Sequence, residues 1–217
     1  MTDQELIERT AEHVRRGSEG EGSGHDWWHV HRVWSTARTL AEQEDVDGVV
    51  VELAALLHDI ADWKFHDGDL SAGPRAARAW LEDLGAAPEL TDRVVDIVGR
   101  VSYKGAGVPD EMPSLEGRVV QDADRLDAMG AIGIARAFAY GGHANRPIHD
   151  PEIPVVLHDA PEAYAASRSG SLNHFPEKLL LLRDRMHTAA GRRVAEERHA
   201  YMAAFVERFL AEWDGRA

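Results

Sequence analysis

The feature that most constrains the fold is a mostly apolar run that ends in an adjacent histidine and aspartate. The run covers residues 49–57, and His58-Asp59 follows it directly. This pattern predicts a helix over about residues 49–61 that is buried nearly all round. An imidazole and a carboxylate at the end of such a helix are costly unless both are satisfied. Both are good metal ligands; the alternative is that His58 caps the helix and Asp59 pairs with a surface cation.

Composition narrows the classes of partner. The chain has 217 residues, which suits one domain, and its 24 basic against 38 acidic residues give a net charge of −14. That balance argues against nucleic-acid and anionic-membrane partners, although a local group of cations can still hold a small anion. The absence of cysteine excludes disulfides and thiolate chemistry. We see no signal peptide and no membrane-spanning run, so we expect a cytoplasmic protein, either monomer or homodimer.

Helical patterns dominate the rest of the chain. Apolar spacing predicts further helices over residues 3–16, 26–41, 72–84, 88–101, 115–126, 128–140, 174–187 and 191–213. The stretch 141–171 is rich in glycine, proline and histidine, which predicts a lid or specificity segment, with disorder as the alternative. We find no strand pair, internal repeat or linker. The expected fold class is therefore all-α, with one domain over 1–217 that closes with helices within 174–213.

Three histidines lie near the start of the helix predicted over 26–41, and any one of them could face the interior. His29 lies closer to the apolar face of that helix than His25 or His31. The adjacent pair Trp27-Trp28 supports burial here, because both indoles need cover. We therefore expect His29 to face the interior; the alternative is a surface histidine at a helix N-terminus.

Three carboxylates lie in the helix predicted over 115–126 or just after it. Asp122, Asp124 and Asp127 alternate with apolar residues, so at least one of them could serve a buried site. Periodicity places Asp127 nearest the apolar face, with the other two flanking it about equally. It does not choose among the three, and a solvated acidic face is the alternative for each.

Three ordered motifs carry a resemblance to a known family: Asp26-x-x-His29-x-x-Arg32-Val33, Leu56-Leu57-His58-Asp59 and Ala123-Asp124-Arg125-Leu126. They resemble the HD-domain metal-dependent phosphohydrolases, in which a lone histidine, an adjacent His-Asp pair and a distant aspartate bind one metal. The resemblance implies an HD-type helical bundle with its metal-site core over about residues 25–128. It implies four metal ligands, namely His29, His58, Asp59 and Asp124. Asp124 is chosen because the last ligand of that family typically sits in an Ala-Asp step.

The resemblance extends to a subgroup of small bacterial enzymes. Residues 121–136, 174–180 and 195–198 are similar to members associated with nucleotide hydrolysis, including release of pyrophosphate from (deoxy)nucleoside triphosphates. His187 stands where an asparagine is expected in that subgroup. The resemblance implies a nucleoside triphosphate pyrophosphohydrolase. The alternatives are a phosphomonoesterase, a cyclic-nucleotide phosphodiesterase, or a non-catalytic nucleotide-sensing module.

The resemblance also implies a cofactor and a catalytic base. Nitrogen and carboxylate ligands suit a divalent ion, for which we favour Mn²⁺ and keep Mg²⁺, Co²⁺, Ni²⁺, Fe²⁺ and Zn²⁺ as alternatives. Asp62 follows Asp59 by three residues and so lies on the same helix face. It resembles the residue that orients or deprotonates the water in related enzymes; the alternative is a surface acid.

A triphosphate substrate would need several cations in a chain this acidic. The candidate phosphate contacts are Arg32, Lys64, His66, Lys104, Arg125 and Lys178. Each alone is more often a solvated surface cation. The sequence contains neither a P-loop motif nor a serine nucleophile elbow, so readings based on those motifs lack support.

Overall fold

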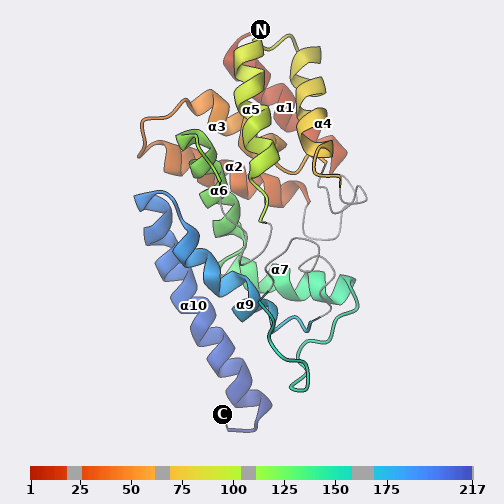
Figure 1. Cartoon of the computed structure of the whole chain (residues 1–217), viewed down its shortest axis with the longest axis vertical. Helices are drawn as coiled ribbons and strands as arrows, with labels where there is room; N and C mark the ends of the chain where they lie inside the picture. Colours follow the sequence, from red (N-terminus) through yellow and green to blue (C-terminus); the bar gives the residue numbers. More distant parts are fainter. Residues whose placement is uncertain (19–25, 62–68, 104–110, 158–168, 217) are drawn as a thin grey trace. The chain divides into compact units, whose positions relative to one another are not determined.

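A computed structural model describes residues 1–18, 26–61, 69–103, 111–157 and 169–216. These residues form α-helices and one 3-10 helix, with no strand among them, which confirms the expected all-α class (Figure 1). No helix in the described ranges is long and apolar enough to cross a membrane. The elements are α1 (Asp3–Gly17), α2 (Trp27–Ala41), α3 (Gly48–Leu57), α4 (Ala72–Asp83), α5 (Pro88–Arg100), α6 (Leu115–Asp127), α7 (Gly130–His143), α9 (His174–Glu177), η2 (Leu179–Arg185) and α10 (Ala189–Trp213).

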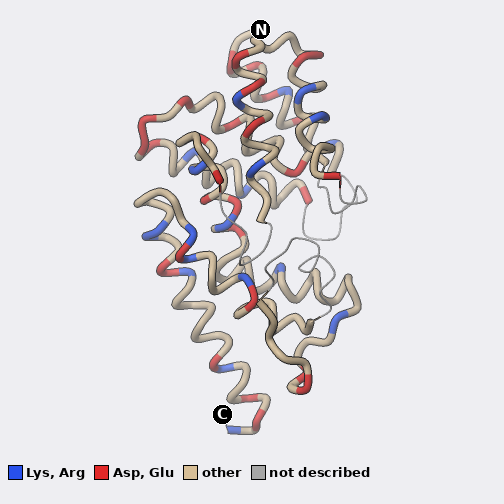
Figure 2. The backbone as a smooth tube through the Cα atoms, in the orientation of Figure 1, with Lys and Arg blue, Asp and Glu red and all other residues tan. Residues whose placement is uncertain are grey.

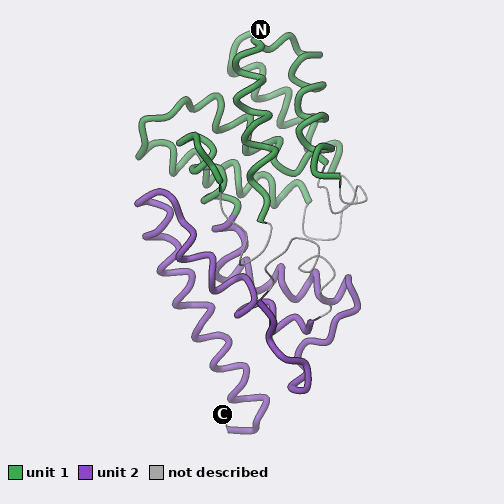
Figure 3. Tube along the Cα trace, viewed as in Figure 1, with its two compact units in different colours: residues 1–103, 110–124 green, residues 104–109, 125–217 purple. Residues whose placement is uncertain are grey.

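The chain divides into two compact units (Figure 3). Unit 1 is made of residues 1–103 and 110–124, and unit 2 of residues 104–109 and 125–217. Basic and acidic positions are interspersed along the helices of both units (Figure 2). The expectation of one domain over 1–217, with a metal-site core over 25–128, stays a prediction.

Helix α3 is the central element of unit 1. It packs against α1, α2 and α5. Seven of its ten residues have no exposed surface, namely Val50, Val51, Leu53, Ala54, Ala55, Leu56 and Leu57. The predicted burial is therefore confirmed. Asp47 starts the helix by accepting hydrogen bonds from the N–H groups of Val49 and Val50.

The helix ends at Leu57, four residues earlier than the predicted end at residue 61. The side chain of His58 contacts the last turn of this helix. Its Nδ1 lies 2.8 Å from the carbonyl oxygen of Ala55. This carbonyl belongs to the last turn of the helix and accepts a hydrogen bond from the imidazole. The next residues, including Ile60, form a turn.

Unit 2 contains a cluster of four aromatic side chains, and its helices differ from the sequence prediction. Phe138, Phe175, Phe205 and Phe209 come from α7, α9 and α10, with ring centroids 5.8–6.2 Å apart in the pairs that touch. Helix α7 runs to His143, three residues beyond its predicted end. The single helix predicted over 174–187 is instead two short elements, α9 and η2.

We expect a stacked pair in unit 1 to make stability sensitive to acid. The rings of His13 and Trp80 lie 3.7 Å apart and nearly parallel, and burial lowers the pKa of His13. The folded-state pKa therefore lies below the unfolded value of about 6.5, so stability falls as the pH drops below that value. We expect His13→Phe to lose less stability than the parent between pH 7.5 and 5, measured by urea midpoints. A midpoint difference that is the same at both pH values would contradict this.

Candidate metal centre

The first site residue is fixed by the start of α2. Asp26 caps this helix, and its Oδ1 accepts a hydrogen bond from the backbone N–H of His29 at 3.0 Å. His29 has no exposed surface, whereas His31 points to solvent. The prediction that His29 faces the interior is confirmed. The expected cover of both indoles is wrong for Trp28, which is 62% exposed.

The second residue is oriented by the backbone of α3. His58 is 5% exposed, and its Nδ1 contacts the Ala55 carbonyl. Because a carbonyl can only accept, Nδ1 carries the proton. The Nε2 of a neutral His58 is then left with a lone pair. An imidazole held in this way by a backbone carbonyl is the usual arrangement of a metal-binding histidine.

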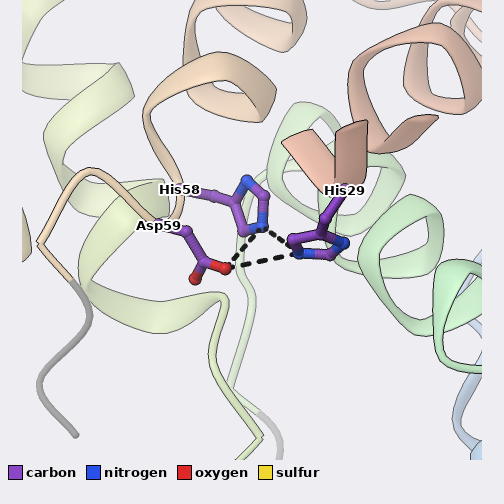
Figure 4. A group of neighbouring side chains, drawn as sticks. All are labelled: His29, His58 and Asp59. Atoms are coloured by element: carbon purple, nitrogen blue, oxygen red, sulfur yellow. Dashed lines mark hydrogen bonds and ion pairs between the residues drawn. The ribbon is translucent and has the colours of Figure 1, made fainter. Parts of the chain in front are cut away.

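Three side chains converge on one point (Figure 4). The Nε2 atoms of His29 and His58 are 3.2 Å apart. Oδ2 of Asp59 lies 3.3 Å from the first nitrogen and 3.5 Å from the second. The Asp59 side chain is 11% exposed. Nearly buried, the group offers two nitrogens and one carboxylate oxygen to the same space.

One of the three acids of α6 faces this group. Oδ1 of Asp124 lies 3.7 Å from Nε2 of His29 and 3.8 Å from Nε2 of His58. Asp127 instead forms an ion pair with Arg136 at 2.8 Å. Asp122 is fully buried. Helix periodicity did not choose among these three acids. In the structure, the carboxylate that lies near the two imidazoles is that of Asp124.

His29, His58 and Asp59 have the spacing of ligands to a single divalent ion. Two ligand atoms that each lie about 2.1 Å from one ion are about 3.0 Å apart at a right angle and about 3.4 Å apart at a tetrahedral angle. The three tightest separations, 3.2, 3.3 and 3.5 Å, fall close to that range, and those to Asp124 are slightly wider. Two imidazoles and two carboxylates without thiolate suit several divalent metals and do not identify one.

Three of the candidate phosphate contacts lie in the described parts of the chain. Arg32 is half-buried on α2, and Lys178 is half-buried between α9 and η2. Arg125 is 4% exposed and donates to the backbone carbonyl of Arg185, with His187 Nε2 3.3 Å away. Its guanidinium therefore also holds protein backbone within unit 2. The proposed base Asp62 and the cations Lys64, His66 and Lys104 lie outside the described residues.

Two further residues of unit 2 make buried contacts that the sequence did not predict. Arg198 of α10 donates to the carbonyl of Leu126 near the end of α6, and burial lowers the pKa of this guanidinium. Glu177 is 4% exposed and accepts two hydrogen bonds. Both residues lie in motifs that resemble the bacterial subgroup, which was the only signal for them in the sequence.

The chain belongs to the HD-domain family, as its sequence and its relatives show. The profile of the family described as HD domain matches residues 27–129, a range that contains all four side chains. Members of this superfamily include hydrolases, and the family assignment supports a hydrolase here.

The chain is similar to several bacterial proteins. It is 41% identical to the uncharacterized protein YpgQ of Bacillus subtilis over 196 residues, which cover 90% of this chain and 87% of YpgQ. A crystal structure of YpgQ in complex with ADP matches with 34% identity and a TM-score of 0.73, covering 95% of this chain and 100% of the other. An HD-superfamily hydrolase from Bacillus thuringiensis matches with 44% identity and a TM-score of 0.74, covering 98% of this chain and 99% of the other.

Proposed function

We propose that this protein is a metal-dependent nucleotide phosphohydrolase that converts (deoxy)nucleoside triphosphates to the monophosphate and pyrophosphate. The observation that carries the proposal is the convergence of His29, His58, Asp59 and Asp124 at the end of a buried helix. The ADP complex of YpgQ supports a nucleotide as the ligand class. The choice of triphosphate and of bond comes from the resemblance to the bacterial subgroup.

In this proposal the residues of the chain serve as metal ligands, as a catalytic base or as phosphate contacts. His29, His58, Asp59 and Asp124 would hold the ion, which, when bound, supplies positive charge that polarises a phosphoryl oxygen and lowers the pKa of water. The Ala55 carbonyl keeps Nε2 of His58 free of a proton. A carboxylate oxygen of Asp62 accepts the proton of the water that attacks phosphorus. Arg32, Lys178 and the other candidate cations neutralise the phosphate chain.

A nucleotide panel with product identification tests the proposal. The protein is loaded in turn with Mn²⁺, Mg²⁺, Co²⁺, Ni²⁺, Fe²⁺ or Zn²⁺ and incubated with ribo- and deoxyribonucleoside triphosphates, with nucleoside monophosphates and with cyclic nucleotides. The products are separated by ion exchange. We expect equal amounts of monophosphate and pyrophosphate. Orthophosphate as the only phosphate product would favour a phosphomonoesterase, and ring opening of cyclic nucleotides a phosphodiesterase. No turnover of any nucleotide with any ion would contradict all three.

A non-catalytic nucleotide sensor is the second candidate. It would bind nucleotides tightly and release no product. The full set of four ligating side chains argues against it, because a protein that only senses nucleotides has no need of a metal centre able to polarise water. Calorimetry with ADP, run beside the product analysis, separates binding without turnover from catalysis.

A further inference from the structure

The buried carboxylate of Glu177 connects three parts of unit 2. The residue ends the short helix α9. Its Oε1 accepts the backbone N–H of Val156 at 3.2 Å, and its Oε2 accepts the hydroxyl of Ser169 at 2.7 Å. Val156 lies 21 residues before Glu177, and Ser169 lies 8 residues before it. One side chain therefore holds two separate chain segments against the same helix.

A second side chain strengthens this connection. Asn173 immediately precedes α9 and is 5% exposed. Its Nδ2 donates to the carbonyl of Ile153 at 2.9 Å. Backbone hydrogen bonds from Ser171 to Pro147 and from Leu172 to Ile148 extend the same contact. The segment 147–156 is thus held along its length by residues 171–177, and Glu177 provides the last of these contacts.

The contacts of Glu177 need hydrogen-bonding atoms in the right places, but they do not need a negative charge. Both of its partners in the described parts of the chain are neutral, namely the N–H of Val156 and the hydroxyl of Ser169. A glutamine has the same outline. Its amide oxygen can accept from Val156, and its amide nitrogen can donate to the hydroxyl oxygen of Ser169, since a hydroxyl also accepts. A leucine would fill the space and lose both hydrogen bonds.

We propose that Glu177 is a positioning residue for substrate binding, which acts through Lys178. Lys178 directly follows Glu177 and lies between α9 and η2, where the backbone leaves the helical conformation. Its position therefore depends on how firmly α9 is held. The inference rests on the proposed function, in which Lys178 contacts the phosphates. Glu177 itself binds no substrate atom; it fixes the end of α9, to which Lys178 is joined directly.

Steady-state kinetics of two substitutions at one position test this proposal. Glu177→Leu is expected to raise KM about tenfold, the equivalent of about 1.4 kcal/mol for the two lost hydrogen bonds, with kcat within about threefold of the parent. Glu177→Gln is expected to keep both constants within about twofold. Metal content should not change in either variant. Glu152→Gln, which alters an exposed carboxylate on the held segment, serves as the control.

Further variants show whether the effect passes through Lys178. Lys178→Ala should raise KM by itself, and Glu177→Leu should add little to it in the double variant. Ser169→Ala removes one of the two donors, so its KM should lie between those of the parent and Glu177→Leu; it also keeps the test open if the leucine variant fails to fold. Additive effects, an unchanged KM in Glu177→Leu, or a glutamine variant as impaired as the leucine variant would each overturn the proposal.

Hydrogen exchange separates this proposal from the proposed function. The amide of Val156 should exchange slowly in the parent and in Glu177→Gln, and faster in Glu177→Leu. If the parent hydrolyses no nucleotide, the proposed function fails, whereas this exchange pattern would still support the contact. Equal exchange in all three proteins would overturn the contact itself.

Discussion

Replacing His58 by alanine is expected to abolish metal binding and nucleotide hydrolysis together. The substitution removes one of two nitrogens that lie 3.2 Å apart, and with it the imidazole that the Ala55 carbonyl orients. Substitutions that only disturb such an orienting partner cost about 10–100-fold in affinity, so loss of the ligand itself should cost more than about 100-fold. Elemental analysis of the purified variant should find no bound divalent metal, and turnover should fall to the background rate.

Thermal unfolding gives a second readout of the same substitution. A ligand present at 100 times its dissociation constant stabilises a folded protein by about 2.7 kcal/mol. Added Mn²⁺ should therefore raise the Tm of the parent and leave that of His58→Ala unchanged. His31→Ala is the matched control, because His31 is a solvent-exposed histidine on the same helix as His29. Full metal content in His58→Ala would contradict the ligand assignment.

Replacing Asp62 by asparagine is expected to leave the metal in place and remove most of the rate. The proposed role of this carboxylate is to accept a proton from the attacking water, and positioned acid–base groups contribute about 10²- to 10⁴-fold. Asparagine has the same size but cannot accept that proton at neutral pH. We expect kcat to fall by about this factor, with unchanged metal content and unchanged affinity for ADP.

The matched control for Asp62 is Asp83→Asn, which alters an exposed carboxylate at the end of α4. It should behave as the parent in all three measurements. An Asp62→Asn variant that turns over as fast as the parent would place the base elsewhere. A variant that loses its metal would instead assign Asp62 to the metal centre.

The central helix and the tautomer of its histidine illustrate what sequence can and cannot predict. A mostly apolar run that ends in His58-Asp59 was enough to predict a buried helix, because few other structures hide so many apolar side chains. The helix end was predicted four residues too late. The hydrogen bond from His58 to the Ala55 carbonyl depends on a side-chain torsion, which leaves no pattern in the sequence.

The choice among the three acids shows a different limit. On a helical wheel Asp127 lies nearest the apolar face, yet its carboxylate pairs with Arg136, and Asp124 faces the two histidines. Periodicity describes one helix at a time, whereas the position of a ligand depends on what packs against that helix. Only the resemblance to the HD-domain phosphohydrolases pointed to Asp124.

Residues 174–187 show how a local break is missed. Their apolar spacing predicts one helix, but the structure has α9 and η2 with Lys178 between them. Two contacts that hold α9 come from Val156 and Ser169, which precede its last residue, Glu177, by 21 and 8 residues. Helix propensity describes one stretch of sequence at a time, so it does not predict contacts between segments that only the fold brings together.

A crystal structure with Mn²⁺ and a deoxynucleoside triphosphate analogue that cannot be cleaved between its α- and β-phosphates tests the central claim most directly. An anomalous difference map should show one manganese peak within about 2.0–2.3 Å of His29 Nε2, His58 Nε2 and an oxygen of each of Asp59 and Asp124, with an α-phosphate oxygen also in ligand distance. A manganese peak away from these four side chains, or one at the site that no phosphate oxygen reaches, would contradict a metal-dependent phosphohydrolase built on this centre.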